Sequence, residues 1–184
     1  MTGRRAATIR ALPEPSCALP PRWSRFQPGQ GRRSKDGTTD IEILNYALSL
    51  ENLETSFYAK VIESGLFRGG RLDLIRKFAD NEREHRELLE TTVDKLGGKP
   101  AAPKKTTFPM DGASSVLRLA ATIENGGAAA YLGQANRIRD KEVLAAALSI
   151  HSVEARHAAT LNGLVGCRQH RRAASRSRSR WRRS

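Results

Sequence analysis

The feature that most constrains this chain is a duplicated pattern of glutamate, tyrosine and histidine. In each copy a tyrosine follows a glutamate by seven residues, and a histidine follows a second glutamate by three. The copies are Glu51, Tyr58, Glu82 and His85, then Glu124, Tyr131, Glu154 and His157. Corresponding positions lie 72 or 73 residues apart. Residues three apart on a helix share one face, so each Glu-x-x-His pair can bind a single metal ion. The repeat predicts four helices that bring four carboxylates and two imidazoles into one interior.

The charge of the chain is distributed very unevenly. The net charge is +13 over 184 residues, yet residues 38–166 carry 16 basic and 17 acidic side chains. The excess belongs to residues 1–37, which are rich in Pro and Arg, and to residues 167–184, which are rich in Arg and Ser. Neither end shows an apolar period, so both are predicted to be disordered basic tails. Residues 38–166 are predicted to form a single domain.

Helical periodicity within this domain predicts helices over residues 41–65, 72–96, 116–138 and 143–164. Residues 38–40, the pair Ser114 and Ser115, and Asp140 are suitable N-caps for three of them. Residues 99–112 contain three prolines and can extend roughly 45 Å, enough to run along a 26-residue helix of about 39 Å. The expected fold is therefore all-α, an antiparallel four-helix bundle with a long crossover between its second and third helices.

The four glutamates fall near the middle of their predicted helices, so they can meet at one depth in the bundle. Unpaired carboxylates in an apolar interior cost several kcal/mol each, and bound cations remove that cost. Four glutamates and two neutral histidines carry a charge of −4, which two divalent ions balance. Oxygen and imidazole donors suit Fe²⁺ or Mn²⁺. The competing interpretation of any one glutamate is a solvated helix face.

Three further positions bear on the site. Tyr58 and Tyr131 lie two turns after their glutamates, where each hydroxyl can hydrogen-bond a ligand from another helix; each is equally well explained as a core tyrosine. Glu54 competes with Glu51 for the position on the first helix. Because the counterpart of Glu54 in the second half is Gly127, the symmetry of the repeat selects Glu51.

The segments around Asn45–Tyr58 and Ile123–Gly133 resemble the ferritin-like domain family, in particular its desiccation-related branch, and the resemblance covers residues 38–166. It implies a ferritin-like four-helix bundle with a dinuclear centre of two iron ions, manganese being the alternative. The resemblance carries the ligand roles to Glu51, Glu82, His85, Glu124, Glu154 and His157. It does not imply one established activity.

Two functional classes follow. The first is a di-metal oxidoreductase that oxidises Fe²⁺ or reduces oxygen or peroxide, in iron handling or in protection against oxidative or desiccation stress. It needs no catalytic residue beyond the ligands. The second is a stress-related structural or binding protein whose metal only stabilises the bundle. A DNA-protecting protein is suggested only by the basic tails and is less favoured, because the repeat completes a site within one chain. A homo-oligomer is compatible with each.

The sequence also bears on location. No run of eighteen apolar residues exists, so no transmembrane span is expected. Cys17 and Cys167 lie at the edges of the domain and indicate neither a disulfide framework nor a thiolate site. Arg4 and Arg5 are similar to a twin-arginine export signal, but no apolar region follows them. A cytoplasmic location is expected, although members of the resembled family are often exported.

Overall fold

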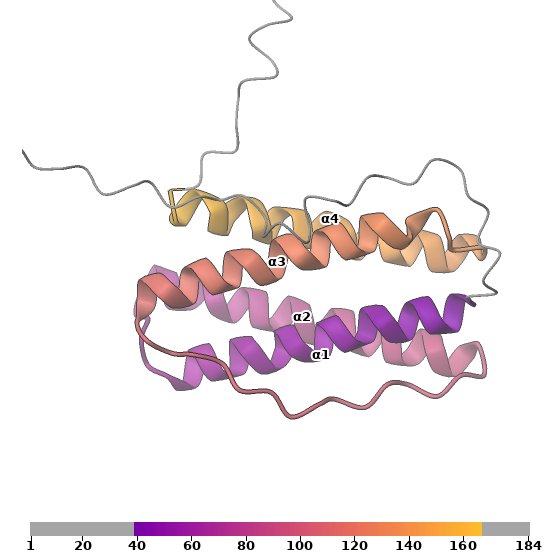
Figure 1. The fold of residues 1–184 in the computed structure, drawn as a ribbon, viewed down its shortest axis with the longest axis horizontal. Coiled ribbons are helices and arrows are strands. Elements are labelled where there is room, and N and C mark those ends of the chain that lie inside the picture. The colour runs from indigo at the N-terminus through magenta and orange to yellow at the C-terminus, as the bar shows by residue number, and fades with distance from the viewer. Residues whose placement is uncertain (1–38, 167–184) are drawn as a thin grey trace, which may run out of the picture.

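The computed structural model describes residues 39–166, which form four α-helices and contain no strand (Figure 1). The helices are α1 (Asp40–Glu63), α2 (Gly70–Lys95), α3 (Ala113–Ala135) and α4 (Lys141–Leu164). The prediction of an all-α four-helix bundle is confirmed. The predicted basic tails and both cysteines lie outside the described residues.

The bundle consists of two helical hairpins. Helix α1 packs mainly against α2, and α3 mainly against α4. The segment between α2 and α3 runs along the length of the bundle, so that α3 starts at the end where α2 starts (Figure 1). Helices α2 and α3 are therefore parallel, and the predicted long crossover is confirmed.

Two of the predicted N-caps are present. The Thr39 hydroxyl accepts a hydrogen bond from the Glu42 backbone N–H, and Glu42 accepts one from the Thr39 N–H at 2.7 Å, which completes a capping box. At the start of α4, Asp140 Oδ1 accepts from the backbone N–H groups of Glu142 and Val143. Both caps satisfy backbone donors that a helix start otherwise leaves unpaired.

The predicted cap at Ser114 and Ser115 is wrong. Helix α3 begins at Ala113 and its N-cap is Gly112, which makes no side-chain capping bond. Gly112 has a φ of 133°, which side-chain-bearing residues rarely adopt. The Ser115 hydroxyl instead donates to the Gly112 carbonyl at 2.9 Å. The chain direction is thus set by the glycine.

Two asparagines on α1 fasten the start of the crossover. The Asn45 side chain donates to the Lys99 carbonyl at 3.1 Å and accepts from the Ala101 N–H at 2.7 Å. About two turns further along α1, Asn52 donates to the Ala101 carbonyl at 3.2 Å. These bonds satisfy backbone groups of a segment that has no secondary structure of its own.

The hydrophobic core is divided into two clusters. One includes Phe57, Phe78 and Leu161, and the other includes Leu48, Leu89 and Ile150. On every helix, the buried glutamates stand in the sequence between residues of one cluster and residues of the other. The middle of the bundle is therefore a polar layer enclosed by apolar ones.

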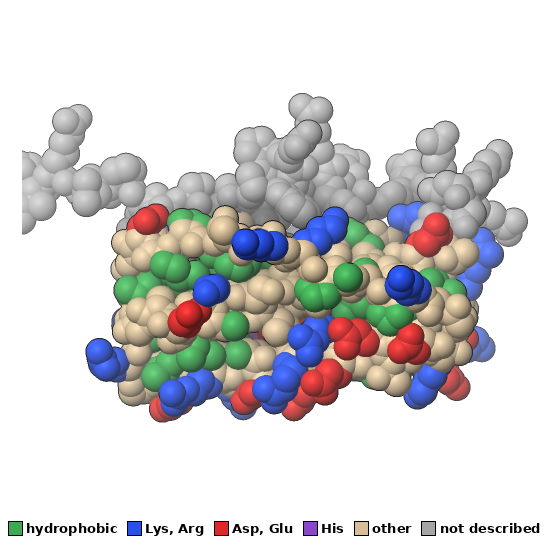
Figure 2. All heavy atoms as spheres, turned by 90° about the horizontal axis from the view of Figure 1, so that it is seen from below, with side chains coloured by type: hydrophobic (Ala, Val, Ile, Leu, Met, Phe, Trp, Pro, Cys, Tyr) green, Lys and Arg blue, Asp and Glu red, His purple; other side chains and the backbone are tan. Residues whose placement is uncertain are grey.

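The exterior of the described residues is mixed in charge. On the face shown in Figure 2, Lys and Arg side chains are interspersed with Asp and Glu around hydrophobic patches. Within residues 39–166, no helix is both long enough and apolar enough to cross a bilayer.

Candidate metal centre

Each helix contributes one glutamate of the repeat to the polar layer, and all four are fully buried. Glu51, Glu82, Glu124 and Glu154 are each 0% exposed, while the two histidines are 7% and 4% exposed. Helical periodicity explains this, because each glutamate lies on the inward stripe that also carries the neighbouring apolar residues. The structure brings together all six side chains that the sequence repeat singled out.

The carboxylate of Glu82 lies between the two histidines. Its Oε2 is 2.9 Å from His85 Nδ1, and its Oε1 is 2.9 Å from His157 Nδ1. His85 Nδ1 also lies 3.2 Å from Glu154 Oε1 and 3.4 Å from Glu51 Oε2. Glu82 therefore presents one oxygen to each half of the site.

The donor atoms form two groups whose members lie within 4.8 Å of one another. Glu51 and His85 belong only to the first group, and Glu124 and His157 only to the second. Glu82 and Glu154 belong to both. Each group thus offers three carboxylates and one imidazole, a donor set that suits a bound cation.

The two tyrosines connect the halves of the repeat. The Tyr131 hydroxyl on α3 donates to Glu51 Oε1 on α1 at 2.5 Å. Reciprocally, the Tyr58 hydroxyl on α1 donates to Glu124 Oε1 on α3. Each hydrogen bond holds one carboxylate oxygen and leaves the other oxygen directed at the site. Both tyrosines are buried, so a buried hydroxyl and a buried carboxylate satisfy one another.

Burial and mutual charge strongly perturb the acid–base properties of the carboxyl groups. Burial raises the pKa of Glu154 to about 10 and that of Glu51 to about 7. Burial also acts upward on the pKa of Glu82, but the nearby imidazoles of His157 and His85 outweigh it and lower that pKa to about 2. Glu82 therefore stays ionised at neutral pH.

The pKa values of both histidines are raised, whereas burial alone would lower them. Burial lowers the pKa of His85, but the surrounding Glu154, Glu51 and Glu82 outweigh it and raise that pKa to about 12. For His157, Glu124 and Glu82 outweigh burial in the same way and raise the pKa to about 9. Without cations, both histidines and the carboxyl groups with raised pKa values thus hold protons.

The unsatisfied atoms fit a bound cation. Glu51 Oε2, Glu124 Oε2, both oxygens of Glu154, and the facing pair of Glu82 Oε1 and His157 Nδ1 are buried without a hydrogen-bond partner. The facing pair is only 2.9 Å apart, yet it lacks hydrogen-bond geometry. Buried polar atoms in native proteins are normally paired. Carboxylate oxygens and imidazole nitrogens are donors that Fe²⁺ and Mn²⁺ accept.

Neighbouring side chains orient His157 more tightly than the sequence indicates. Its ring stacks on Phe78 with centroids 4.0 Å apart, and its Nε2 lies 3.4 Å from Asn81 Oδ1. An Nε2–H bonded to this oxygen leaves Nδ1 as the donor for a cation. Asn81 directly precedes Glu82, but nothing in the repeat distinguishes it, because its counterpart is Val153.

The structure also buries Glu54, which the sequence analysis weighed against Glu51. The repeat set this residue aside in favour of Glu51, but Glu54 is 2% exposed and lies in the same interior. Burial, followed by the charges of Glu154 and Glu51, raises its pKa well above the usual value. The layer thus holds five carboxyl groups rather than four. The E-x-x-E spacing on one helix, which places both glutamates on one face, is the signal that could have found it.

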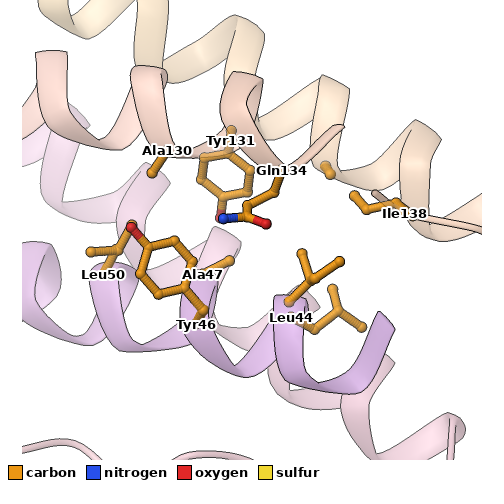
Figure 3. Close-up of a pocket in the computed structure, with 10 residues that line it drawn as sticks. Leu44, Tyr46, Ala47, Leu50, Ala130, Tyr131, Gln134 and Ile138 are labelled. Atoms are coloured by element: carbon orange, nitrogen blue, oxygen red, sulfur yellow. The ribbon is translucent and has the colours of Figure 1, made fainter. Parts of the chain in front are cut away.

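A small apolar pocket lies beside the site, between α1 and α3 (Figure 3). Tyr46, Ala47 and Leu50 line it from α1, and Tyr131 and Gln134 from α3. Tyr131 therefore contacts both this pocket and, through its hydroxyl, the carboxylate of Glu51.

Comparison with known proteins agrees with the four-helix fold. The family model described as a ferritin-like domain matches residues 39–167. Among solved structures, a conserved hypothetical protein of Mycobacterium tuberculosis, rv2844, has a similar fold with a TM-score of 0.62. Its sequence identity is 22%, over 71% of this chain and 93% of that chain, so the likeness concerns the fold. No curated protein matches the chain.

Proposed function

Because the chain belongs to the ferritin-like domain family, we propose that it holds two iron or manganese ions in its polar layer and uses them in redox chemistry. The substrate class is Fe²⁺ with oxygen or peroxide, and the role is iron handling or protection against oxidative or desiccation stress. The observation that carries the proposal is the pair of four-donor groups that share two carboxylates.

The residues divide into three roles. Glu51 with His85 would hold one ion, Glu124 with His157 would hold the other, and Glu82 and Glu154 would contribute to both positions. Bound iron would supply the electrons for the reduction of oxygen or peroxide, which protein side chains alone do not provide. Tyr58 and Tyr131 would fix the outer oxygens of Glu124 and Glu51.

The protein also controls protons and water at the site. The apolar clusters on both sides exclude bulk water, which strengthens every charge interaction inside. Binding of cations requires the loss of protons from the histidines and from the raised carboxyl groups. The site would therefore release protons when it loads.

The first test is metal analysis of protein purified under native conditions. We expect about two Fe or Mn ions per chain, in line with dinuclear sites in such bundles, and loss of both in Glu82→Ala/His85→Ala. The matched control is Glu84→Ala/Glu87→Ala, a pair with the same spacing on the exposed face of α2. A parent protein that stays free of metal even with added Fe²⁺ and Mn²⁺ would contradict the proposal.

The redox step needs a separate test. Iron-loaded parent protein should consume oxygen or peroxide as Fe²⁺ is oxidised, and Glu51→Ala/Glu124→Ala should abolish this consumption because each ion loses a terminal carboxylate. Metal-loaded protein that leaves both oxidants untouched would remove the redox role while leaving metal binding intact.

Complete burial of the four carboxylates favours one alternative, in which the metal only stabilises the bundle. Removing the metal would then unfold the helices, since a ligand that binds only the native state adds to stability. Far-UV circular dichroism of the metal-free protein measures this directly. Loss of helicity together with inert bound metal would select the structural role.

A further inference from the structure

The fifth buried carboxyl group has no partner that explains it. Glu54 is 2% exposed, and its Oε2 makes no hydrogen bond. No basic side chain forms an ion pair with it among the described residues. Burial raises its pKa most, and the neighbouring charges that raise it further are carboxylates, Glu154 first. A buried acid that is neither paired nor hydrogen-bonded is expensive, so a ligand is the natural explanation.

The opposite helix leaves room for this carboxyl group. A Cβ atom on Gly127 would lie 2.8 Å from Glu54 Oε1 and 2.7 Å from Glu154 Oε2, closer than such atoms approach. Gly127 is the symmetry counterpart of Glu54, which lies 73 residues earlier. The absence of a side chain at Gly127 therefore leaves the space that the Glu54 carboxyl group occupies.

On this basis we propose that Glu54 is a further carboxylate of the metal centre, recruited as a ligand beside Glu154, and that it makes the two metal positions inequivalent. Neither four-donor group includes Glu54, which distinguishes it from the six ligands of the repeat. The inference rests on the proposed metal binding. It predicts that one of the two ions has an additional oxygen donor and a higher affinity than the other.

The test uses Co²⁺ as a spectroscopic probe in the full-length, metal-free protein. Titration should show two ions per chain bound with different affinities. In Glu54→Gln, which keeps the shape and removes the charge, we expect one affinity to fall about tenfold or more, as for loss of a supporting carboxylate, and the visible Co²⁺ bands to change. The control is Glu63→Gln, an exposed glutamate at the end of the same helix, which should bind like the parent.

A second pair of variants tests the role of the space. Gly127→Ala should weaken Co²⁺ binding as Glu54→Gln does, because its methyl group would displace the carboxyl groups of Glu54 and Glu154. Gly126→Ala is the matched control, since a Cβ there meets nothing within 4 Å. It should bind two ions with the affinities of the parent.

The outcomes separate the two proposals. If the parent binds no Co²⁺, Fe²⁺ or Mn²⁺, both the metal centre and this inference are overturned. If the parent binds two ions and Glu54→Gln binds them with unchanged affinities and bands, only the role of Glu54 is overturned. Failure of Glu54→Gln to fold overturns that role as well, because an unpaired acid that serves as a ligand is not needed to hold the metal-free bundle together.

Discussion

The tyrosine hydroxyls are the only uncharged side-chain donors that hydrogen-bond the carboxylates of the repeat within the described residues. Each tyrosine bonds a glutamate of the other half, so a substitution of Tyr131 on α3 affects the carboxylate of Glu51 on α1. Tyr131 is the informative one, because its ring also forms a wall of the apolar pocket.

Tyr131→Phe should destabilise the metal-free protein by about 1–3 kcal/mol, the cost of leaving a buried acceptor without its donor. It should also weaken metal binding roughly tenfold, as loss of a group that orients a ligand does. Urea unfolding and metal titration measure the two effects. Tyr46→Phe is the control, since Tyr46 lines the same pocket but is 42% exposed. Equal behaviour of the two variants would show that the hydroxyl of Tyr131 contributes nothing.

At this scale the repeat predicted six residues correctly as neighbours, because a spacing of three or seven fixes the helix face. It set Glu54 aside because the corresponding residue in the second half is Gly127, whereas in the structure Glu54 is buried in the same layer and its Oε1 lies where a Cβ on Gly127 would come within 2.8 Å. The contacts of His157 with Asn81 and Phe78 depend on how two helices pack, which spacing along one helix does not reveal.

At the scale of elements, capping chemistry predicted where α1 and α4 begin, because Thr39 and Asp140 act on backbone groups two or three residues away. The start of α3 was mispredicted, since two serines stand beside a glycine whose backbone conformation decides the turn. The prolines of the crossover predicted its existence, but its attachment to α1 through Asn45 and Asn52 involves residues about fifty positions apart.

Asn45→Ala tests that attachment. It removes two hydrogen bonds, to the Lys99 carbonyl and from the Ala101 N–H, and should cost about 1–2 kcal/mol in the free energy of unfolding. Amide hydrogen exchange at Ala101 should become faster, because its N–H loses its acceptor, while exchange in the centre of α2 follows only the global stability. Ser49→Ala is the control, as its hydroxyl bonds only within its own helix. Unchanged exchange at Ala101 would show that the crossover is held by other contacts.

At the scale of the whole molecule, the bundle surrounds a layer of five acids and two histidines with two apolar clusters. Such a layer opposes folding unless protons or cations occupy it. The same side chains must therefore bind protons in the metal-free protein and lose them on loading, so pH links stability to metal binding.

The sign of this linkage follows from the pKa shifts. In the folded metal-free protein Glu51 and Glu154 titrate at about 7 and 10, and His157 and His85 at about 9 and 12. In the unfolded chain these groups lose their protons near 4.5 for Glu and 6.5 for His. Between pH 5.5 and 8.5 the folded state therefore binds more protons than the unfolded state, and its stability falls as pH rises. Glu82, lowered to about 2, has the opposite sign, but its effect is confined to lower pH.

The metal-free protein should consequently lose stability from pH 5.5 to 8.5, with a fall in Tm of roughly 5 °C or more for a domain of this size. Metal affinity should rise over the same interval, because fewer protons remain to be displaced, so the increase in Tm on adding Mn²⁺ should grow with pH. Thermal unfolding followed by circular dichroism, with and without Mn²⁺, measures both. In Glu154→Gln, the Tm of the metal-free protein should fall less steeply with pH, because the glutamine amide does not titrate. The exposed control Glu84→Gln should match the parent. A metal-free protein that becomes more stable toward pH 8.5 would contradict the proton binding inferred for the layer.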